Sequence, residues 1–127
     1  MKKNILVIDD SPFILKILSE ALSDGFHVET AHSAEEAFDL LNASDASSSN
    51  SVVFDLVITD LNMPGLNGYD VAKFIRAKNR KKKFTPVIML TDMDIKKEDA
   101  RKHGCAAYIP KSDLKKVVSI ARILLTK

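Results

Sequence analysis

The stretch ILVIDDSP, residues 5–12, decides the fold of this chain. Four apolar and mostly β-branched residues run directly into two adjacent carboxylates, Asp9 and Asp10, followed by Ser11 and Pro12. An unbroken apolar run of this length is typical of a strand covered on both faces. Proline is tolerated in the first turn of a helix, where its missing N–H has no partner to lose. The stretch therefore predicts a buried strand, two carboxylates at its end, and a helix after a Ser11 N-cap.

The same alternation of apolar runs and segments of helical period continues along the chain, which predicts βαβ units around a parallel sheet. Strands are predicted at Asn4–Asp9, His27–Ala31, Phe54–Asp60, Pro86–Thr91 and Ala106–Ile109. Helices are predicted at Pro12–Leu22, Ala34–Leu41 after a Ser33 and Glu36 capping box, Asn67–Lys78, Asp94–His103 and Asp113–Thr126. The predicted buried face of the first helix is Ile14, Ile17, Leu18, Ala21 and Leu22. The Ser-rich residues 43–51 are predicted to form a loop.

Length and composition predict one domain over residues 1–127. The chain has 46% hydrophobic and 28% charged residues, and no apolar run approaches the roughly 18 residues of a membrane span. The run before Asp9 is also too short for a signal peptide, so we expect a cytoplasmic protein. Cys105 is the single cysteine and excludes an internal disulfide or a cysteine-based zinc cluster.

The net charge of +2 conceals an uneven distribution. Residues 1–70 contain 3 basic and 12 acidic groups, whereas residues 71–127 contain 16 and 5. Such asymmetry raises the alternative of a nucleic-acid binder, with the basic run Arg80–Lys83 as the contact. Because aromatic residues are not interleaved in that run, a solvated loop is favoured over a contact to phosphates.

Polar side chains follow the predicted strands at the points where these strands end. They are Asp9 and Asp10 after the first strand, Asp60 after the third, Thr91 after the fourth and Lys111 beyond the fifth. In an open parallel sheet, ligands bind at the carboxyl ends of the strands. Crowded carboxylates raise one another's pKa unless a cation lies among them. Mg²⁺, which takes oxygen ligands from one or two carboxylates together with phosphate oxygens, fits this set better than Ca²⁺.

Asp60 is the candidate nucleophile of this site, because a carboxylate can accept a phosphoryl group as an aspartyl phosphate. Lys111 supplies a positive charge and Thr91 a hydroxyl donor where phosphoryl oxygens would lie.

The segments VIDDSP, VITDLNMPGLNG, VIMLT and GCAAYIPK, in this order and spacing, resemble the receiver domain of bacterial two-component response regulators over the whole chain. The resemblance implies a flavodoxin-like α/β fold, a three-layer sandwich of five parallel strands in order 2-1-3-4-5 with five helices. It also implies a regulatory domain, not an enzyme, which takes a phosphoryl group on Asp60 from a sensor histidine kinase or phosphotransfer protein with Mg²⁺ as the cofactor.

The resemblance further implies the roles of individual residues. Asp10, Asp60 and the backbone carbonyl of Asn62 would bind Mg²⁺ directly, and Asp9 would act through water. Thr91 and Tyr108 match the two switch residues, whose movement would remodel the face of the fourth helix, fifth strand and fifth helix for a downstream protein partner. We expect no output domain within the chain, no direct contact with nucleic acid or membrane, and a monomer or phosphorylation-dependent dimer.

Two positions depart from the family pattern. Receivers usually have a proline in a cis peptide after the site lysine, whereas Ser112 follows Lys111 here and Pro110 precedes it. A cis bond before serine costs about 2.5–4 kcal/mol, so we expect a trans peptide and a displaced Lys111. Asp92 places a fourth carboxylate beside the site and is predicted either to slow phosphorylation by repulsion or to restrict access to the acyl phosphate.

A Mg²⁺-dependent aspartyl-phosphate phosphatase or phosphotransferase is the alternative from another functional class. Against it, Asn62 stands where haloacid-dehalogenase-like phosphatases have a second aspartate as general acid, and Asp60 follows the third strand instead of the first.

Overall fold

A computed structural model describes residues 2–44, 53–78, 85–92 and 102–126. Three sequence features fall wholly or largely outside these ranges: most of the Ser-rich segment 43–51, the basic run Arg80–Lys83 and the predicted helix Asp94–His103. The structure therefore does not test these three predictions. Among the described residues, no helix is both long and apolar enough to cross a membrane.

Five parallel strands form a single sheet, and its order confirms the prediction. The strands are β1 (Asn4–Ile8), β2 (His27–Ala31), β3 (Leu56–Asp60), β4 (Val87–Thr91) and β5 (Ala107–Pro110), arranged β2-β1-β3-β4-β5. β3 and β4 are buried along their whole length, as their unbroken apolar runs predict. The two strands next to β1 lie on opposite sides of it, so the strand order reverses there. In sheets of this kind, ligands bind at the carboxyl edge beside such a reversal.

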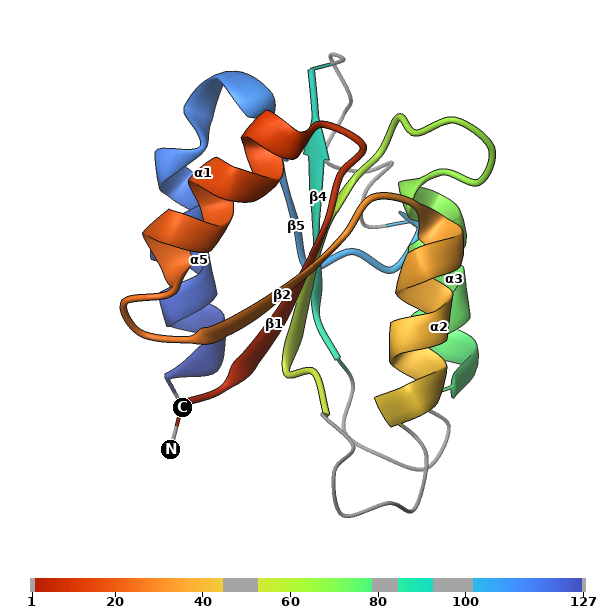
Figure 1. Ribbon diagram of the computed structural model, residues 1–127, viewed down its shortest axis with the longest axis horizontal. Coiled ribbons are helices and arrows are strands. Elements are labelled where there is room, and N and C mark those ends of the chain that lie inside the picture. The colour runs from red at the N-terminus through yellow and green to blue at the C-terminus, as the bar shows by residue number, and fades with distance from the viewer. Residues whose placement is uncertain (1, 45–52, 79–84, 93–101, 127) are drawn as a thin grey trace.

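The helices cover both faces of the sheet (Figure 1). α1 (Pro12–Leu22) and α5 (Lys115–Leu125) lie on one face, and α2 (Ala34–Ser44) and α3 (Gly68–Lys78) lie on the other. The described residues thus contain four of the five predicted α-helices. A short 3₁₀ turn, Lys111–Asp113, precedes α5, so that helix begins two residues later than predicted.

Side chains at the helix starts satisfy the free backbone N–H groups. Ser11 caps α1 by accepting a hydrogen bond from the Ile14 N–H at 3.4 Å. In α2 the Ser33 hydroxyl accepts from the Glu36 N–H at 3.1 Å, but the Glu36 carboxylate accepts from the N–H of His32 instead of Ser33. The bond from the Glu36 N–H to the Ser33 hydroxyl is therefore as predicted, whereas the bond to the Glu36 carboxylate comes from the residue before Ser33.

α3 has a reciprocal box that the sequence analysis did not identify. The side-chain Oδ1 of Asn67 accepts from the Asp70 N–H at 3.1 Å, and the Asp70 carboxylate accepts from the Asn67 N–H at 2.8 Å. These two bonds fix the first turn of α3 immediately after the loop that follows Asp60.

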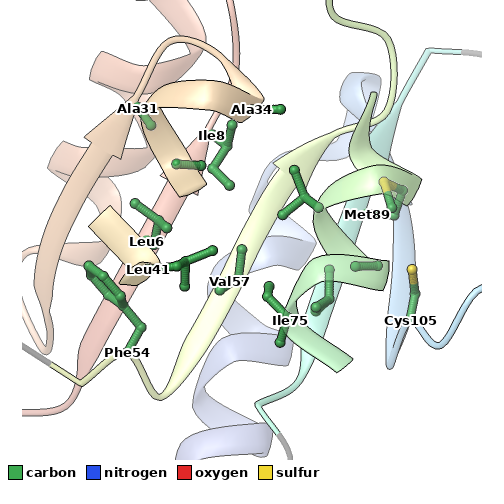
Figure 2. Close-up of a cluster of buried hydrophobic side chains, with 14 of the residues drawn as sticks. Leu6, Ile8, Ala31, Ala34, Leu41, Phe54, Val57, Ile75, Met89 and Cys105 are labelled. Carbon is green, nitrogen blue, oxygen red and sulfur yellow. The ribbon is translucent and has the colours of Figure 1, made fainter. Parts of the chain in front are cut away.

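Each face of the sheet has its own apolar core. Figure 2 shows the core between the sheet and the helices α2 and α3, where Leu6, Val57 and Met89 from three strands meet Leu41 and Ile75. Cys105 is buried at the margin of this core. The second core lies under α1 and α5, with buried members Ile5, Val7, Leu15, Leu18, Leu22, Leu56, Ile58, Ile88, Leu90, Ile109, Val117, Ala121 and Leu125.

The predicted face of α1 is partly wrong. The helix buries Leu15, Leu18 and Leu22, whereas Ala21 is exposed and Ile14 is only partly buried. Because α1 is apolar on more than one side, its hydrophobic periodicity alone does not determine which of these sides packs against the sheet.

Candidate phosphoacceptor site

Asp60, the last residue of β3, lies in a buried cluster of charged groups. Its side chain is 1% exposed, and one of its oxygens accepts a hydrogen bond from the Asn62 N–H at 3.3 Å. The strand continues to pair beyond it, since the Leu61 N–H donates to the Leu90 carbonyl at 2.8 Å. The sheet itself thus fixes the position of this carboxylate.

Asp9 lies beside Asp60 and is fully buried at the end of β1. Its Oδ1 accepts a hydrogen bond from the Ser11 N–H at 2.9 Å, so the turn into α1 holds the carboxylate in place. Asp10, the next residue, is exposed. One ligand oxygen from each of Asp9, Asp10 and Asp60 lies within 4.8 Å of the others. The structure therefore brings together the three carboxylates that the sequence predicted.

Lys111 reaches both buried carboxylates from the turn after β5. Its Nζ is 3.1 Å from Asp60 Oδ2 and 3.2 Å from Asp9 Oδ2, and its side chain is 19% exposed. No peptide bond among the described residues is cis, which agrees with the trans peptide expected before Ser112. Lys111 nevertheless reaches the site, because the 3₁₀ turn beginning at this residue directs its ammonium group toward Asp9 and Asp60.

The two oxygens that face Lys111 are paired by charge but not by directed hydrogen bonds. Asp9 Oδ2 and Asp60 Oδ2 are buried and accept no hydrogen bond of good geometry, although the ammonium group lies within 3.2 Å of both. We therefore treat these contacts as ion pairs. Buried oxygens of this kind retain unused acceptor capacity, which a hard cation can satisfy.

The burial of the site changes the proton affinity of its groups. Burial raises the pKa of Asp60 to about 6, and the neighbouring Asp9 charge adds to this, while Lys111 acts in the opposite direction. Burial likewise raises the pKa of Asp9 against the Ser11 hydrogen bond and the Lys111 charge. For Lys111, burial alone would lower the pKa, but the two carboxylates outweigh it and the pKa is raised.

The remaining predicted residues lie at the same edge or next to it. Thr91 is fully buried and ends β4, one residue beyond the Leu90 that pairs with Asp60. Asn62 has an exposed side chain in the loop after β3. Tyr108 is half-buried on β5, where it pairs with Met89 and packs against the core under α2 and α3. Asp92 is exposed immediately after Thr91.

Gly68 is a positioning residue that the sequence analysis missed. A β-carbon at this position would lie 2.5 Å from the Asp60 carbonyl oxygen and 2.6 Å from Met89 Sδ. Its N–H donates to the Leu61 carbonyl at 3.0 Å. Only glycine allows α3 to start this close to the strand end. The signal was a glycine in the first turn of the helix predicted from Asn67, where a side chain would otherwise be expected.

Comparison with known proteins agrees with this geometry. The sequence model of the response regulator receiver domain matches residues 5–122. The chain is 35% identical over 125 residues to the transcriptional regulatory protein CpxR of Escherichia coli K12, covering 94% of this chain and 48% of CpxR. It is 38% identical over 109 residues to the chemotaxis protein CheY1 of Helicobacter pylori, covering 84% and 83%. The chain thus spans about half the length of the longer regulators it matches.

A solved structure of a response regulator is also similar. The response regulator TrrA of Thermotoga maritima, in complex with Mg²⁺ and BeF, superimposes with a TM-score of 0.76 at 33% identity, covering 97% of this chain and 99% of that one.

Proposed function

The chain belongs to the response regulator receiver domain family of two-component signalling, and we propose that Asp60 is the residue on which it is phosphorylated. Receivers of this family are regulatory phosphoacceptors. One observation carries the assignment: Asp60 is held at the end of β3 between a second buried carboxylate, Asp9, and the ammonium group of Lys111.

The carboxylate cluster fits a hard divalent cation. The donor set consists of oxygens from Asp9, Asp10 and Asp60, and two of these oxygens are buried without a hydrogen bond. We assign Asp10, Asp60 and the backbone carbonyl of Asn62 as direct ligands of Mg²⁺, with Asp9 acting through water. When bound, Mg²⁺ would neutralise charge that develops on the phosphoryl oxygens and on the carboxylates.

The reaction we propose is transfer of a phosphoryl group from a phosphohistidine of a sensor kinase or phosphotransfer protein. An Asp60 carboxylate oxygen forms the new bond to phosphorus while the bond from phosphorus to the imidazole nitrogen breaks. The electron pair leaves with the imidazole, which is then protonated by solvent. Lys111 and the Thr91 hydroxyl offer donors to the phosphoryl oxygens, and burial of Asp60 limits access of water to the aspartyl phosphate.

The product would act as a switch in the cytoplasm. A phosphoryl group adds about −1.5 to −2 charges at neutral pH and three strong acceptors. Lys111 and Thr91 therefore interact differently with the two states of Asp60, which is the requirement for a shift between conformations. Tyr108 is the proposed second switch residue, and the face that includes β5 and α5 is the proposed surface for a downstream protein.

Intact mass measurement tests the assignment. The protein is incubated with acetyl phosphate and Mg²⁺, alongside Asp60→Asn and the control Asp39→Asn, which makes the same change on the exposed side of α2. We expect one phosphoryl group on the wild type and on Asp39→Asn. Neither protein should gain it when a chelator is added before the phosphodonor. An adduct on Asp60→Asn of equal amount, or none on any protein, would refute the assignment.

No observation favours the phosphatase alternative. Asn62 cannot act as a general acid, because an amide side chain has no proton to give at neutral pH.

A further inference from the structure

The segment that leads into β5 is attached to α3 by two side chains. The ring of His103 stacks on the ring of Tyr69 with centroids 3.8 Å apart and an interplanar angle of 19°. One residue later, the guanidinium of Arg76 packs against the backbone of Gly104, where a β-carbon would lie 3.1 Å from it. Figure 1 shows this segment, in light blue, beginning beside α3 and crossing to the sheet. We call the Tyr69 and His103 pair the aromatic latch.

Each half of the latch is tied to a different part of the proposed switch. Tyr69 directly follows Gly68, whose N–H donates to the Leu61 carbonyl and whose position leaves no room for a β-carbon beside the Asp60 carbonyl. The backbone next to this ring is thus anchored to the strand end that carries the phosphoacceptor. The other half of the latch, His103, lies five residues before Tyr108, the proposed second switch residue. Tyr69 and Tyr108 both pack, partly buried, against the same core under α2 and α3. Tyr108 is therefore connected to the latch in two ways, through the chain to His103 and through the shared core to Tyr69.

We propose that the aromatic latch holds the protein in its unphosphorylated conformation and opposes the activating change. This inference rests on the proposed function, since it concerns the equilibrium that phosphorylation of Asp60 would shift. A contact that is present in only one of two states lowers the free energy of that state by its own interaction energy, and the population of the other state falls accordingly. By linkage, loss of the latch strengthens binding of any ligand that selects the activated state. An aromatic pair is strong enough to change that affinity by roughly 2- to 10-fold.

The test uses beryllofluoride with saturating Mg²⁺ as the probe, since this ligand occupies a related receiver, TrrA. The dissociation constant is measured by titration calorimetry for the wild type, His103→Ala, Tyr69→Ala, the double variant, and Tyr69→Phe, which keeps a ring. Phe38→Leu is the matched control, because Phe38 stacks on Phe74 of α3 at 4.3 Å but joins α3 to α2 and not to the β5 segment.

We expect both single latch variants to bind beryllofluoride roughly 2- to 10-fold more tightly. The double variant should gain no more than either single one, and Tyr69→Phe and Phe38→Leu should bind as the wild type does. Equal or weaker binding by His103→Ala would overturn the latch while leaving the proposed function intact. Failure of the wild type itself to bind would instead overturn the proposed function, and the latch with it.

A second measurement needs no substitution in the latch. The ring protons of His103, one of three histidines in the chain, should be shifted upfield by the stacked tyrosine in the free protein. Saturation with beryllofluoride should move these signals toward the values of an unstacked histidine. Signals that stay shifted upfield in the bound state would overturn the proposal, even if the variants changed affinity for other reasons.

Discussion

Replacing Asp60 by asparagine should stabilise the protein in the absence of divalent cations. Asp60 is 1% exposed, and burial raises its pKa from 3.8 to about 6. A raised pKa means that the folded state binds a proton more tightly than the unfolded state, so ionisation of the group disfavours folding. The stabilising contribution of the protonated group is fully present below pH 3.8 and is lost as the pH rises through about 6.

The size of the effect follows from the same values. A rise in the pKa of an acid from 3.8 to about 6 corresponds to about 3 kcal/mol of free energy of unfolding. This net shift already includes the repulsion by Asp9 and the attraction to Lys111. It is an upper value for Asp60→Asn, because burying the polar amide of asparagine has its own desolvation cost. We expect Asp60→Asn to be more stable than the wild type by about 1–3 kcal/mol at pH 7.5, and the difference to disappear near pH 4.

Urea denaturation followed by far-ultraviolet circular dichroism measures this difference, since the chain has no tryptophan to serve as a fluorescent probe. The titrations are run in chelator at pH 4 and pH 7.5, with Asp39→Asn as the exposed control for the same chemical change. Addition of Mg²⁺ at 100 times its dissociation constant should then stabilise the wild type by about 2.7 kcal/mol and Asp60→Asn by much less.

Two results would contradict this reasoning. If Asp60→Asn is no more stable than the wild type at pH 7.5, the groups around Asp60 fully compensate the cost of burying its negative charge. A gain of equal size at pH 4 would mean that the stabilisation does not arise from ionisation of Asp60.

Three further substitutions test other parts of the site. Gly68→Ala should lower the free energy of unfolding, measured by the same urea titration, by about 1–3 kcal/mol, because the added methyl group would lie 2.5 Å from the Asp60 carbonyl oxygen. Gly25→Ala is the control, since its methyl group would have no atom within 4 Å, and it should change this free energy by less than about 1 kcal/mol. Lys111→Met should slow phosphorylation by acetyl phosphate roughly 10²-fold in a mass-spectrometric time course, and an unchanged rate would exclude the lysine from the reaction. Asp92→Ala should speed the same reaction at low ionic strength and less so at high salt, whereas equal rates would remove the repulsion argument.

The sheet could be predicted because each strand carries its own signal. Apolar runs such as LVIT and VIML are too short for helices and too continuous for exposed strands, so their type and burial follow from the sequence alone. The strand order 2-1-3-4-5 has a different origin. It came from the family resemblance, since periodicity does not specify which strands pair.

The site could be predicted in its membership but not in its internal geometry. Position at strand ends placed Asp9, Asp10, Asp60 and Lys111 together, and the structure confirms this. Which of the two adjacent aspartates is buried depends on the twist of the last residue of β1 and on the hydrogen bond from Ser11. The order of residues specifies neither of these two features. It also does not predict that Lys111 reaches the site from a 3₁₀ turn.

The close approach at Gly68 and the aromatic latch share one reason for escaping sequence analysis. Both depend on three-dimensional contacts, of Gly68 with the end of β3 and with Met89 and of Tyr69 with His103, which residue order does not specify. Their common position is nevertheless informative, because α3 contacts the backbone of the phosphoacceptor at one residue and the segment before β5 at the next. The Gly68 N–H donates to the Leu61 carbonyl, one residue after Asp60, and the next residue, Tyr69, stacks on His103. Because protein interiors are close-packed and transmit strain, we expect the start of α3 to link the carboxylate cluster to the segment before β5.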